Sequence, residues 1–283
     1  MPIARLFHGA ALKGINRVIF GCGVGPIHTS QMRMQIAHII KSSNVAFYRD
    51  QESLDYALHL GGDEANSKLA CDPATAFINR WREANPKKED SKRISTMLRE
   101  QTAEYDKKAD IDSQNMVFPS RISEVLVDLK KNYSSIEELN LIPMHVYWRG
   151  NDDRLLNLKI AKKVSDNLYI NPYLGYKGIY ELIDSLSQSK LAIAMRYHGH
   201  IFSIALNIPF ISLDYTGKKG KVSNLMQRLG LKEYSVKFED FTPSVLKPKL
   251  EQIEANADLA EDLRNKTQEL TATLEEAYRF YWN

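Results

Sequence analysis

Residues 190–221 read KLAIAMRYHGHIFSIALNIPFISLDYTGKKGK, and this stretch decides the fold. Its first run, Leu191–Met195, is apolar at every position, which is typical of a parallel strand buried on both faces. Arg196 and His198 follow at once, where the strand pattern gives way to a helical one. A second apolar strand comes next, so the stretch has the strand–helix–strand order from which parallel sheets are built.

The same alternation continues through the rest of the chain. Short apolar runs bounded by turn residues predict strands, and amphipathic stretches between them predict helices. The predicted strands are 17–22, 44–48, 68–71, 94–98, 138–145, 168–170, 191–195 and 210–213. The predicted helices are 29–42 (with Thr29 or Ser30 as N-cap), 52–60, 120–132, 151–166, 176–188, 199–207 and 221–229, then a helical tail over 246–283. The pattern predicts an α/β protein with two Rossmann-like lobes.

A polar segment divides the chain into these lobes. Residues 82–93 (REANPKKEDSKR) are mixed in charge and contain a proline, as expected of a linker. They separate a first lobe over 1–81 from a second over 94–265. We expect residues 266–283 to form a C-terminal helix that can pack back on the first lobe. The carboxyl ends of the strands should line a cleft between the lobes.

Composition limits the class of protein. The 283 residues are 43% hydrophobic and 26% charged, as in an ordinary globular protein, and a net charge of +3 is too small to predict nucleic-acid binding. No stretch approaches the roughly 18 consecutive apolar residues of an integral membrane segment, and the N-terminus lacks the core of a signal peptide. Two cysteines make no disulfide framework, so we expect a reduced, cytoplasmic location.

Arg196 and His198 form the main chemical candidate. A helix N-terminus carries partial positive charge and free N–H groups, so an anion is stabilised there. The Arg196 guanidinium suits a carboxylate or phosphate, and an imidazole transfers a proton near neutral pH. Two structural interpretations stay open: Arg196 can cap a backbone carbonyl, and His198 can be a satisfied pocket histidine.

Other candidates also have structural interpretations. Asp152 and Asp153 are adjacent and point in different directions, so they do not form a glycosidase-like pair and are more often N-cap and first-turn acids. His198 and His200 have no third ligand at a standard spacing, so we expect no metal. The glycine cluster over 21–25 lacks the spacing of the dinucleotide fingerprint and is most often a tight turn.

Taken in order, these features resemble the polysaccharide pyruvyl transferase family. The most specific match is Arg196-Tyr197-His198 after an apolar strand, followed by a small-residue helix, Pro209, a strand, and Tyr215 before a lysine-rich loop. The upstream matches are Gly21-x-Gly-x-Gly25-Pro26, Tyr48-Arg49-Asp50 with Ser53, Asp72-Pro73-Ala74 with Phe77, Leu98-Arg99-Glu100, and Pro143-Met144-His145 with Asp152-Asp153. The resemblance covers residues 17–230.

The resemblance implies an enzyme that moves the enolpyruvyl unit of phosphoenolpyruvate (PEP) onto a hexose of a polysaccharide, exopolysaccharide or glycan precursor, forming a pyruvate ketal. It implies a GT-B-like fold, PEP as co-substrate without a further cofactor, and a sugar or lipid-linked saccharide as acceptor. Arg196 and His198 would be catalytic. The implied substrate-binding residues are Arg196, Lys218, Lys221, Arg99, His145, Asp153, Gly23 and Asp50. Counting from Tyr215 selects Lys218, whereas aligning the following helix selects Lys221, and both stay open.

The sequence departs from the family at its start. Residues 1–16 are too few to supply the strand and glycine loop with which the family opens, so we expect an incomplete first lobe. An uncovered sheet edge would favour instability or self-association, including a homo-oligomer. Two other functions remain as alternatives: a nucleotide-sugar-dependent glycosyltransferase of GT-B type, or a non-catalytic family member that binds a partner.

Overall fold

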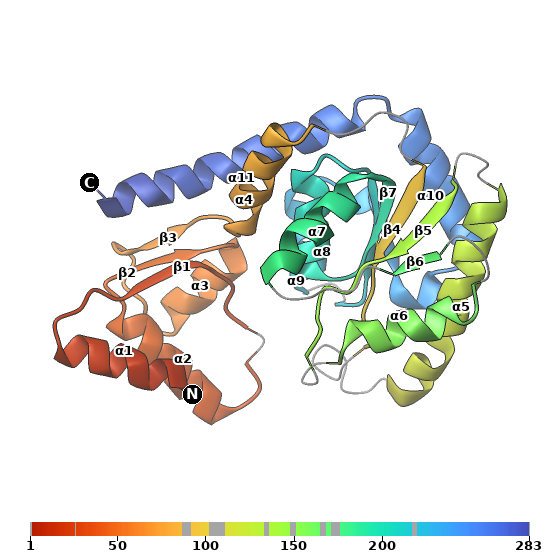
Figure 1. Ribbon diagram of the computed structural model, residues 1–283. Helices are drawn as coiled ribbons and strands as arrows, with labels where there is room; N and C mark the ends of the chain where they lie inside the picture. Colours follow the sequence, from red (N-terminus) through yellow and green to blue (C-terminus); the bar gives the residue numbers. More distant parts are fainter. Residues whose placement is uncertain are drawn as a thin grey trace. The chain divides into compact units, whose positions relative to one another are not determined.

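The computed structural model describes residues 2–25, 27–86, 92–101, 111–132, 136–147, 151–164, 168–170, 176–216 and 220–282. The chain forms two compact units, one made of residues 1–77 with 267–283 and the other of residues 78–266. Each unit contains one sheet in which every pairing is parallel, together with packed helices (Figure 1). The prediction of an α/β protein with two parallel sheets is therefore confirmed.

The sheet of the second unit has six strands in the order β6-β5-β4-β7-β8-β9. Their bounds are β4 (Arg93–Met97), β5 (Glu138–Leu141), β6 (Leu168–Ile170), β7 (Ser189–Ala194), β8 (Phe210–Asp214) and β9 (Ser235–Lys237). The chain runs outward from β4 to β6, returns to β7 beside β4, and then runs outward in the opposite direction. This is the strand order of the Rossmann fold, and the reversal lies between β4 and β7.

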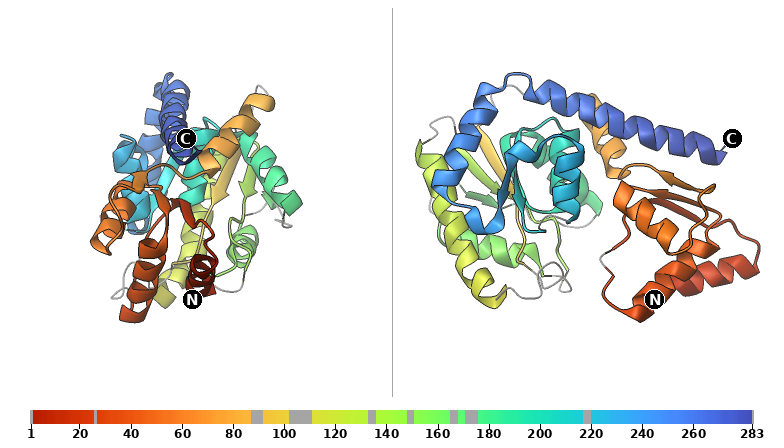
Figure 2. Two further views of the ribbon diagram at one scale, coloured as in Figure 1. Left: turned by 90° about the vertical axis from the view of Figure 1, so that its left-hand side faces the viewer. Right: turned by 180° about the vertical axis from the view of Figure 1, so that it is seen from behind.

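Helices cover both faces of this sheet (Figures 1 and 2). One face carries α5 (Ile111–Asn132), α6 (Asp153–Ala161) and α10 (Pro243–Ala255), and the other carries α7 (Tyr176–Ser187), α8 (Tyr197–Ala205) and α9 (Lys221–Arg228). Coverage on both sides explains the all-apolar run Leu191–Met195, which is buried throughout. Gly199 lets α8 approach β4 closely, because a Cβ there would lie 3.1 Å from the Cβ of Met97.

The first unit has a three-stranded sheet in the order β1-β2-β3. Its elements are α1 (Pro2–Leu12), β1 (Val18–Cys22), α2 (Ser30–Ser42), β2 (Val45–Tyr48), α3 (Gln51–His59) and β3 (Ser67–Leu69). The N-cap of α2 is Thr29, one of the two predicted residues, and its side chain accepts a hydrogen bond from the Met32 N–H. The core contains Ile40, Ala46, Tyr48, Ala57 and Leu60.

Two helices pass from one unit into the other along the chain, α4 (Ala74–Ala84) and α11 (Leu259–Trp282). The end of α11 belongs to the first unit, where the Phe280 ring meets the Phe47 ring edge-on with 6.2 Å between centroids. Lys68 Nζ lies 5.2 Å from the centre of the same Phe280 ring. No helix in the described ranges is both long and apolar enough to cross a membrane.

The elements differ from the predicted ones in several places. Residues 82–84, expected in the linker, form the last turn of α4, and residues 87–91 lie outside the described ranges. The strand predicted over 138–145 ends at Leu141, since Pro143 has no N–H to donate to a ladder. Helices α1 and α4 and strand β9 were not predicted, and β9 is only three residues long. Helix α5 begins at Ile111 and not at 120, and the helical tail predicted over 246–283 is two helices, α10 and α11.

A buried histidine joins α8 to β8 in the second unit. His200 has no exposed surface, and its Nδ1 and Nε2 lie 2.8 Å from the Arg196 carbonyl oxygen and the Ser212 hydroxyl oxygen. Because a carbonyl oxygen only accepts, Nδ1 carries the hydrogen and Nε2 accepts from Ser212. Burial lowers the pKa of His200 from 6.5 to about 4, so the ring is neutral at pH 7.

Gly21 in β1 should not tolerate a side chain. Its φ of 62° lies in the left-handed region, and a Cβ there would overlap Pro73 and lie 3.0 Å from the Cys71 carbonyl oxygen. We expect Gly21→Ala to lower the free energy of unfolding by about 2–4 kcal/mol in urea denaturation. Gly14→Ala is the matched control, because φ is 66° but no other described atom lies within 4 Å. It should cost about 1 kcal/mol, and equal losses would contradict the packing argument.

His200 should make the fold sensitive to acid. The unfolded chain binds a proton at His200 near pH 6.5, whereas the folded chain does so only near pH 4. Stability from the neutral ring is therefore present above pH 6.5 and lost as the pH falls towards 4, by up to about 3 kcal/mol. His200→Asn should be less stable at pH 7 but should lose less stability than wild type between pH 7 and 4.5. Parallel pH profiles of the two proteins in urea denaturation would refute this assignment.

Candidate active site

Candidate residues from four neighbouring strands meet at one edge of the six-stranded sheet. Arg99 follows β4, Arg196 follows β7 and Tyr215 follows β8, while Asp153 begins the helix after β5. Strands β5, β4, β7 and β8 are consecutive in the sheet, so their carboxyl ends line up. The edge is centred on the reversal between β4 and β7, the place where sheets of this type bind ligands.

The Asp153 carboxylate holds Arg196 in place. The Asp153 side chain is fully buried, and it accepts from Arg196 Nε at 3.1 Å and from Arg196 Nη2. One of its oxygens also accepts from the backbone N–H groups of Met144 at 3.1 Å and His145 at 2.9 Å. Within the described residues Arg196 Nη1 makes no hydrogen bond, so one amino group of the fork lies outside the ion pair.

The two adjacent aspartates have different environments, as predicted. Asp152 is the N-cap of α6, and hydrogen bonds from Arg154 lower the pKa of its carboxyl. Burial raises the pKa of Asp153, while the Arg196 guanidinium and the Met144 and His145 N–H groups act in the opposite direction. Asp152 therefore caps a helix, and Asp153 is the acid that contacts the predicted site.

Arg99 is fixed by an aromatic neighbour. Its side chain is buried, its Nη1 donates to the Tyr215 hydroxyl at 3.1 Å, and its guanidinium carbon lies 5.0 Å from the centre of the Tyr215 ring. Its Nε donates to the Glu100 carbonyl at 3.1 Å. The sequence did not single out Tyr215 as a site residue. Its position could have indicated a site residue, because Tyr215 directly follows β8, and β8 is separated from β4 only by β7.

The start of α8 presents His198. Arg196 is the N-cap, with no side-chain capping bond, and His198 is exposed in the first turn with its ring edge-on to those of Tyr197 and Phe202. His200, two residues later, is the fully buried histidine, whereas His198 is exposed. Two histidines two apart on a helix face different ways, which separates their roles.

The predicted lysines lie in and after the loop that follows β8. Lys221 begins α9, and its Nζ lies 6.0 Å from the centre of the Tyr197 ring, so it is close to the start of α8. Lys218 lies outside the described residues. His145 contributes its backbone N–H to Asp153, and its ring lies edge-on to Tyr147 at 5.6 Å between centroids.

The two first-lobe candidates, Gly23 and Asp50, both contact Arg49, which the motif Tyr48-Arg49-Asp50 contains but which was not among the predicted site residues. A Cβ on Gly23 would lie 2.5 Å from the Arg49 guanidinium, so the glycine allows that side chain to approach the backbone. Arg49 forms ion pairs with Asp50 at 3.1 Å and Asp72 at 3.6 Å. Asp50 is also the N-cap of α3. These contacts are internal to the first unit and bring three of the sequence motifs together.

The edge of the second unit is suited to an anion. Two guanidinium groups and a helix N-terminus gather there, and the one buried carboxylate is already paired. Among the described residues no group of three or more His, Cys, Asp or Glu side chains is placed to hold a metal ion. The chemistry available from these residues is anion binding by Arg99 and Arg196 and proton transfer by His198.

Solved structures share the fold. A Listeria monocytogenes protein assigned as a UDP-N-acetylglucosamine 2-epimerase has a TM-score of 0.60 at 11% identity over 91% of this chain and 64% of its own. HepE from Anabaena, solved with UDP and glucose, has a TM-score of 0.59 at 9% identity over 97% of this chain and 73% of its own. MnaA from S. aureus, solved with UDP, has a TM-score of 0.56 at 11% identity over 91% of this chain and 64% of its own. The chain thus spans less than two thirds of the Listeria and S. aureus proteins.

These likenesses confirm the predicted GT-B-like fold class and, at such low identity, show the fold alone. None of the curated proteins matches the chain in sequence. The family model of the polysaccharide pyruvyl transferases matches residues 2–217, about three-quarters of the chain and all of the strand-end motifs described above. The chain therefore belongs to the polysaccharide pyruvyl transferase family.

Proposed function

We propose that this family member transfers the enolpyruvyl group of PEP to a hexose of a polysaccharide or glycan precursor and forms a pyruvate ketal. One observation carries the proposal: Arg99 and Arg196 follow the two strands that flank the sheet reversal, beside the N-terminus of α8. PEP bears a carboxylate and a phosphate, and guanidinium groups bind both kinds of anion through paired N–H donors. Lys221 adds a further cation near the start of α8.

The reaction needs one proton donor and one anion site. Protonated His198 gives its proton to the methylene carbon of PEP, which makes the central carbon electrophilic. A sugar hydroxyl oxygen bonds to that carbon and returns a proton to His198. A second hydroxyl oxygen then bonds to the same carbon as the carbon–oxygen bond to phosphate breaks. The bonding pair leaves with the phosphate, which takes the second hydroxyl proton, so inorganic phosphate and the ketal are the products.

Asp153 acts on this site through Arg196. Its carboxylate binds the Nε and Nη2 side of the fork, which leaves Nη1 and the N-terminus of α8 for the donor. A fully buried acid that is already bonded four times is not a substrate ligand of its own. We therefore assign Asp153 as a positioning residue, in place of the substrate-binding role that the resemblance implied.

The competing function is nucleotide-sugar glycosyl transfer. The observation that favours it is that HepE and MnaA, which share the fold, were solved with UDP. Fold alone does not fix function, since one sheet architecture serves many donors. A nucleotide-sugar enzyme would bind UDP at the β4–β7 edge, and PEP would not displace it.

PEP binding tests the proposal directly. In calorimetric titration we expect saturable binding of PEP to wild type and a dissociation constant at least about tenfold higher for Arg196→Ala, the loss of one charged hydrogen-bonding partner. Arg154→Ala is the matched control, because its guanidinium pairs with the N-cap Asp152. It should bind PEP like wild type. UDP binding that PEP does not displace, or no PEP binding by folded protein, would reject the proposal.

Asp153→Asn separates positioning from binding. Losing the acid breaks a buried pair, so stability should fall by about 3 kcal/mol. Asp153→Asn alone should also lower PEP affinity about tenfold. Added to Arg196→Ala, the same substitution should lower PEP affinity hardly at all. Asp152→Asn, one residue away, removes an acid that pairs with Arg154 and not with Arg196, so it should leave PEP affinity unchanged. Equal effects of Asp153→Asn with and without Arg196 would show that the acid does not act through the arginine.

A further inference from the structure

Charge is segregated within the first unit. Residues 1–49 contain no Asp or Glu, and their basic residues are Arg5, Lys13, Arg17, Arg33, Lys41 and Arg49. Residues 50–77 reverse this, with the acids Asp50, Glu52, Asp55, Asp63, Glu64 and Asp72 against the single Lys68. The small net charge of the whole chain hides this asymmetry, which predicts that the part of the unit built from residues 1–49 attracts an anionic surface.

Helices α1 and α2 form one packed pair within that acid-free segment (Figures 1 and 2). The pair exposes large aliphatic side chains: Leu6 is 70% exposed, Leu12 is 76% exposed and Met34 is 66% exposed. Arg5 in the first half of α1 and Lys13, directly after its last residue, are also exposed. The exposed residues of α1 and the turn after it thus include both cations and aliphatic side chains, and residues 1–49 contribute no acid to pair with these cations.

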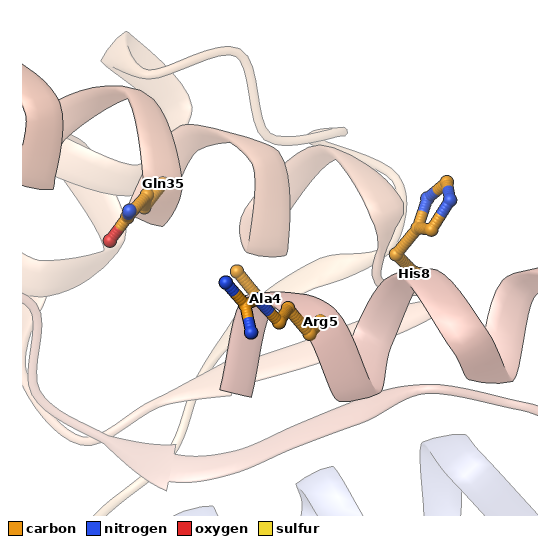
Figure 3. Close-up of a pocket in the computed structure, with 4 residues that line it drawn as sticks. All are labelled: Ala4, Arg5, His8 and Gln35. Atoms are coloured by element: carbon orange, nitrogen blue, oxygen red, sulfur yellow. The ribbon is translucent and has the colours of Figure 1, made fainter. Parts of the chain in front are cut away.

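An open pocket lies between the two helices. It has a volume of about 290 Å³ and is lined by Ala4, Arg5 and His8 of α1 and by Gln35 of α2 (Figure 3). His8 is also 6.1 Å from His38 of α2, measured between ring centroids. A guanidinium, an imidazole and an amide around one opening are groups that bind a phosphate through N–H donors.

We propose that the α1–α2 face binds the surface of an anionic lipid bilayer. Interspersed leucines and basic residues on one exposed helix are the pattern of interfacial helices, which bury the apolar groups at the headgroup boundary and keep the cations among the phosphates. Arg5 and Lys13 contact lipid phosphates, the α1–α2 pocket accepts one headgroup, and Leu6, Leu12 and Met34 enter the acyl region. The proposal does not rest on pyruvyl transfer, although a lipid-linked acceptor would be presented at such a surface.

Vesicle sedimentation of the full chain tests this face. The probes are vesicles of phosphatidylcholine alone and vesicles with about 30% phosphatidylglycerol. Wild type should bind the anionic vesicles, and added salt should weaken that binding. Arg5→Glu with Lys13→Glu should reduce binding by more than tenfold, at about fivefold per lost cationic contact. Leu6→Ser with Leu12→Ser should reduce it similarly.

A matched control comes from the second unit. Leu155 and Leu158 of α6 are also exposed, at 59% and 49%, so Leu155→Ser with Leu158→Ser should leave vesicle binding unchanged. The proposal would be overturned if wild type did not bind anionic vesicles, or if it bound both vesicle types equally. It would also be overturned by a self-association in light scattering that Leu6→Ser with Leu12→Ser abolishes, since a second copy would then be the occupant. Because the charge variants change only exposed side chains, they test the proposal even if the leucine variants fold poorly.

Discussion

A buried ion pair joins the two halves of the six-stranded sheet. Asp153 follows β5 and Arg196 follows β7, so their contact passes over the end of β4, the strand between them. Taking an isolated carboxylate out of water is so unfavourable that Asp153 depends on the guanidinium and on two backbone N–H groups. The turn after β5 and the starts of α6 and α8 are therefore held in one arrangement.

The same arginine is also fixed through its backbone. Its N–H donates to the Met97 carbonyl at 3.2 Å, and its carbonyl accepts from the ring of His200. Side chain, N–H and carbonyl are thus each tied to a different element: α6, the end of β4 and the interior of α8. A cation held this way needs little reorganisation when an anion arrives, which is the condition under which electrostatic binding is most effective. The neutral, buried His200 contributes to this rigidity through its bonds to the Arg196 carbonyl and the Ser212 hydroxyl.

Local pattern was enough for most of the fold. The apolar run at Leu191–Met195 predicted a strand because a strand that is buried on both faces is apolar at every position. Similar short apolar runs predicted the neighbouring strands. Helices α1 and α4 and the three-residue β9 were not predicted from such a pattern. The Arg196–Asp153 contact spans 43 residues of sequence, and no spacing rule reaches that far. The sequence also did not show that His200 is buried, because its packing against β8 decides that.

Fold does not choose between PEP and a nucleotide diphosphate, because a sheet reversal beside a helix N-terminus suits either anion. The side chains carry the difference. Neighbouring strands lie about 4.8 Å apart, so guanidinium groups that follow β4 and β7 start from closely spaced positions. In PEP the carboxylate and the phosphate oxygen are attached to the same carbon, and two adjacent cations match that compact pair of charges. A nucleotide donor spreads its charge along a diphosphate and needs contacts for a base and ribose as well, so the proposal of PEP depends on Arg99 and Arg196 and not on the fold.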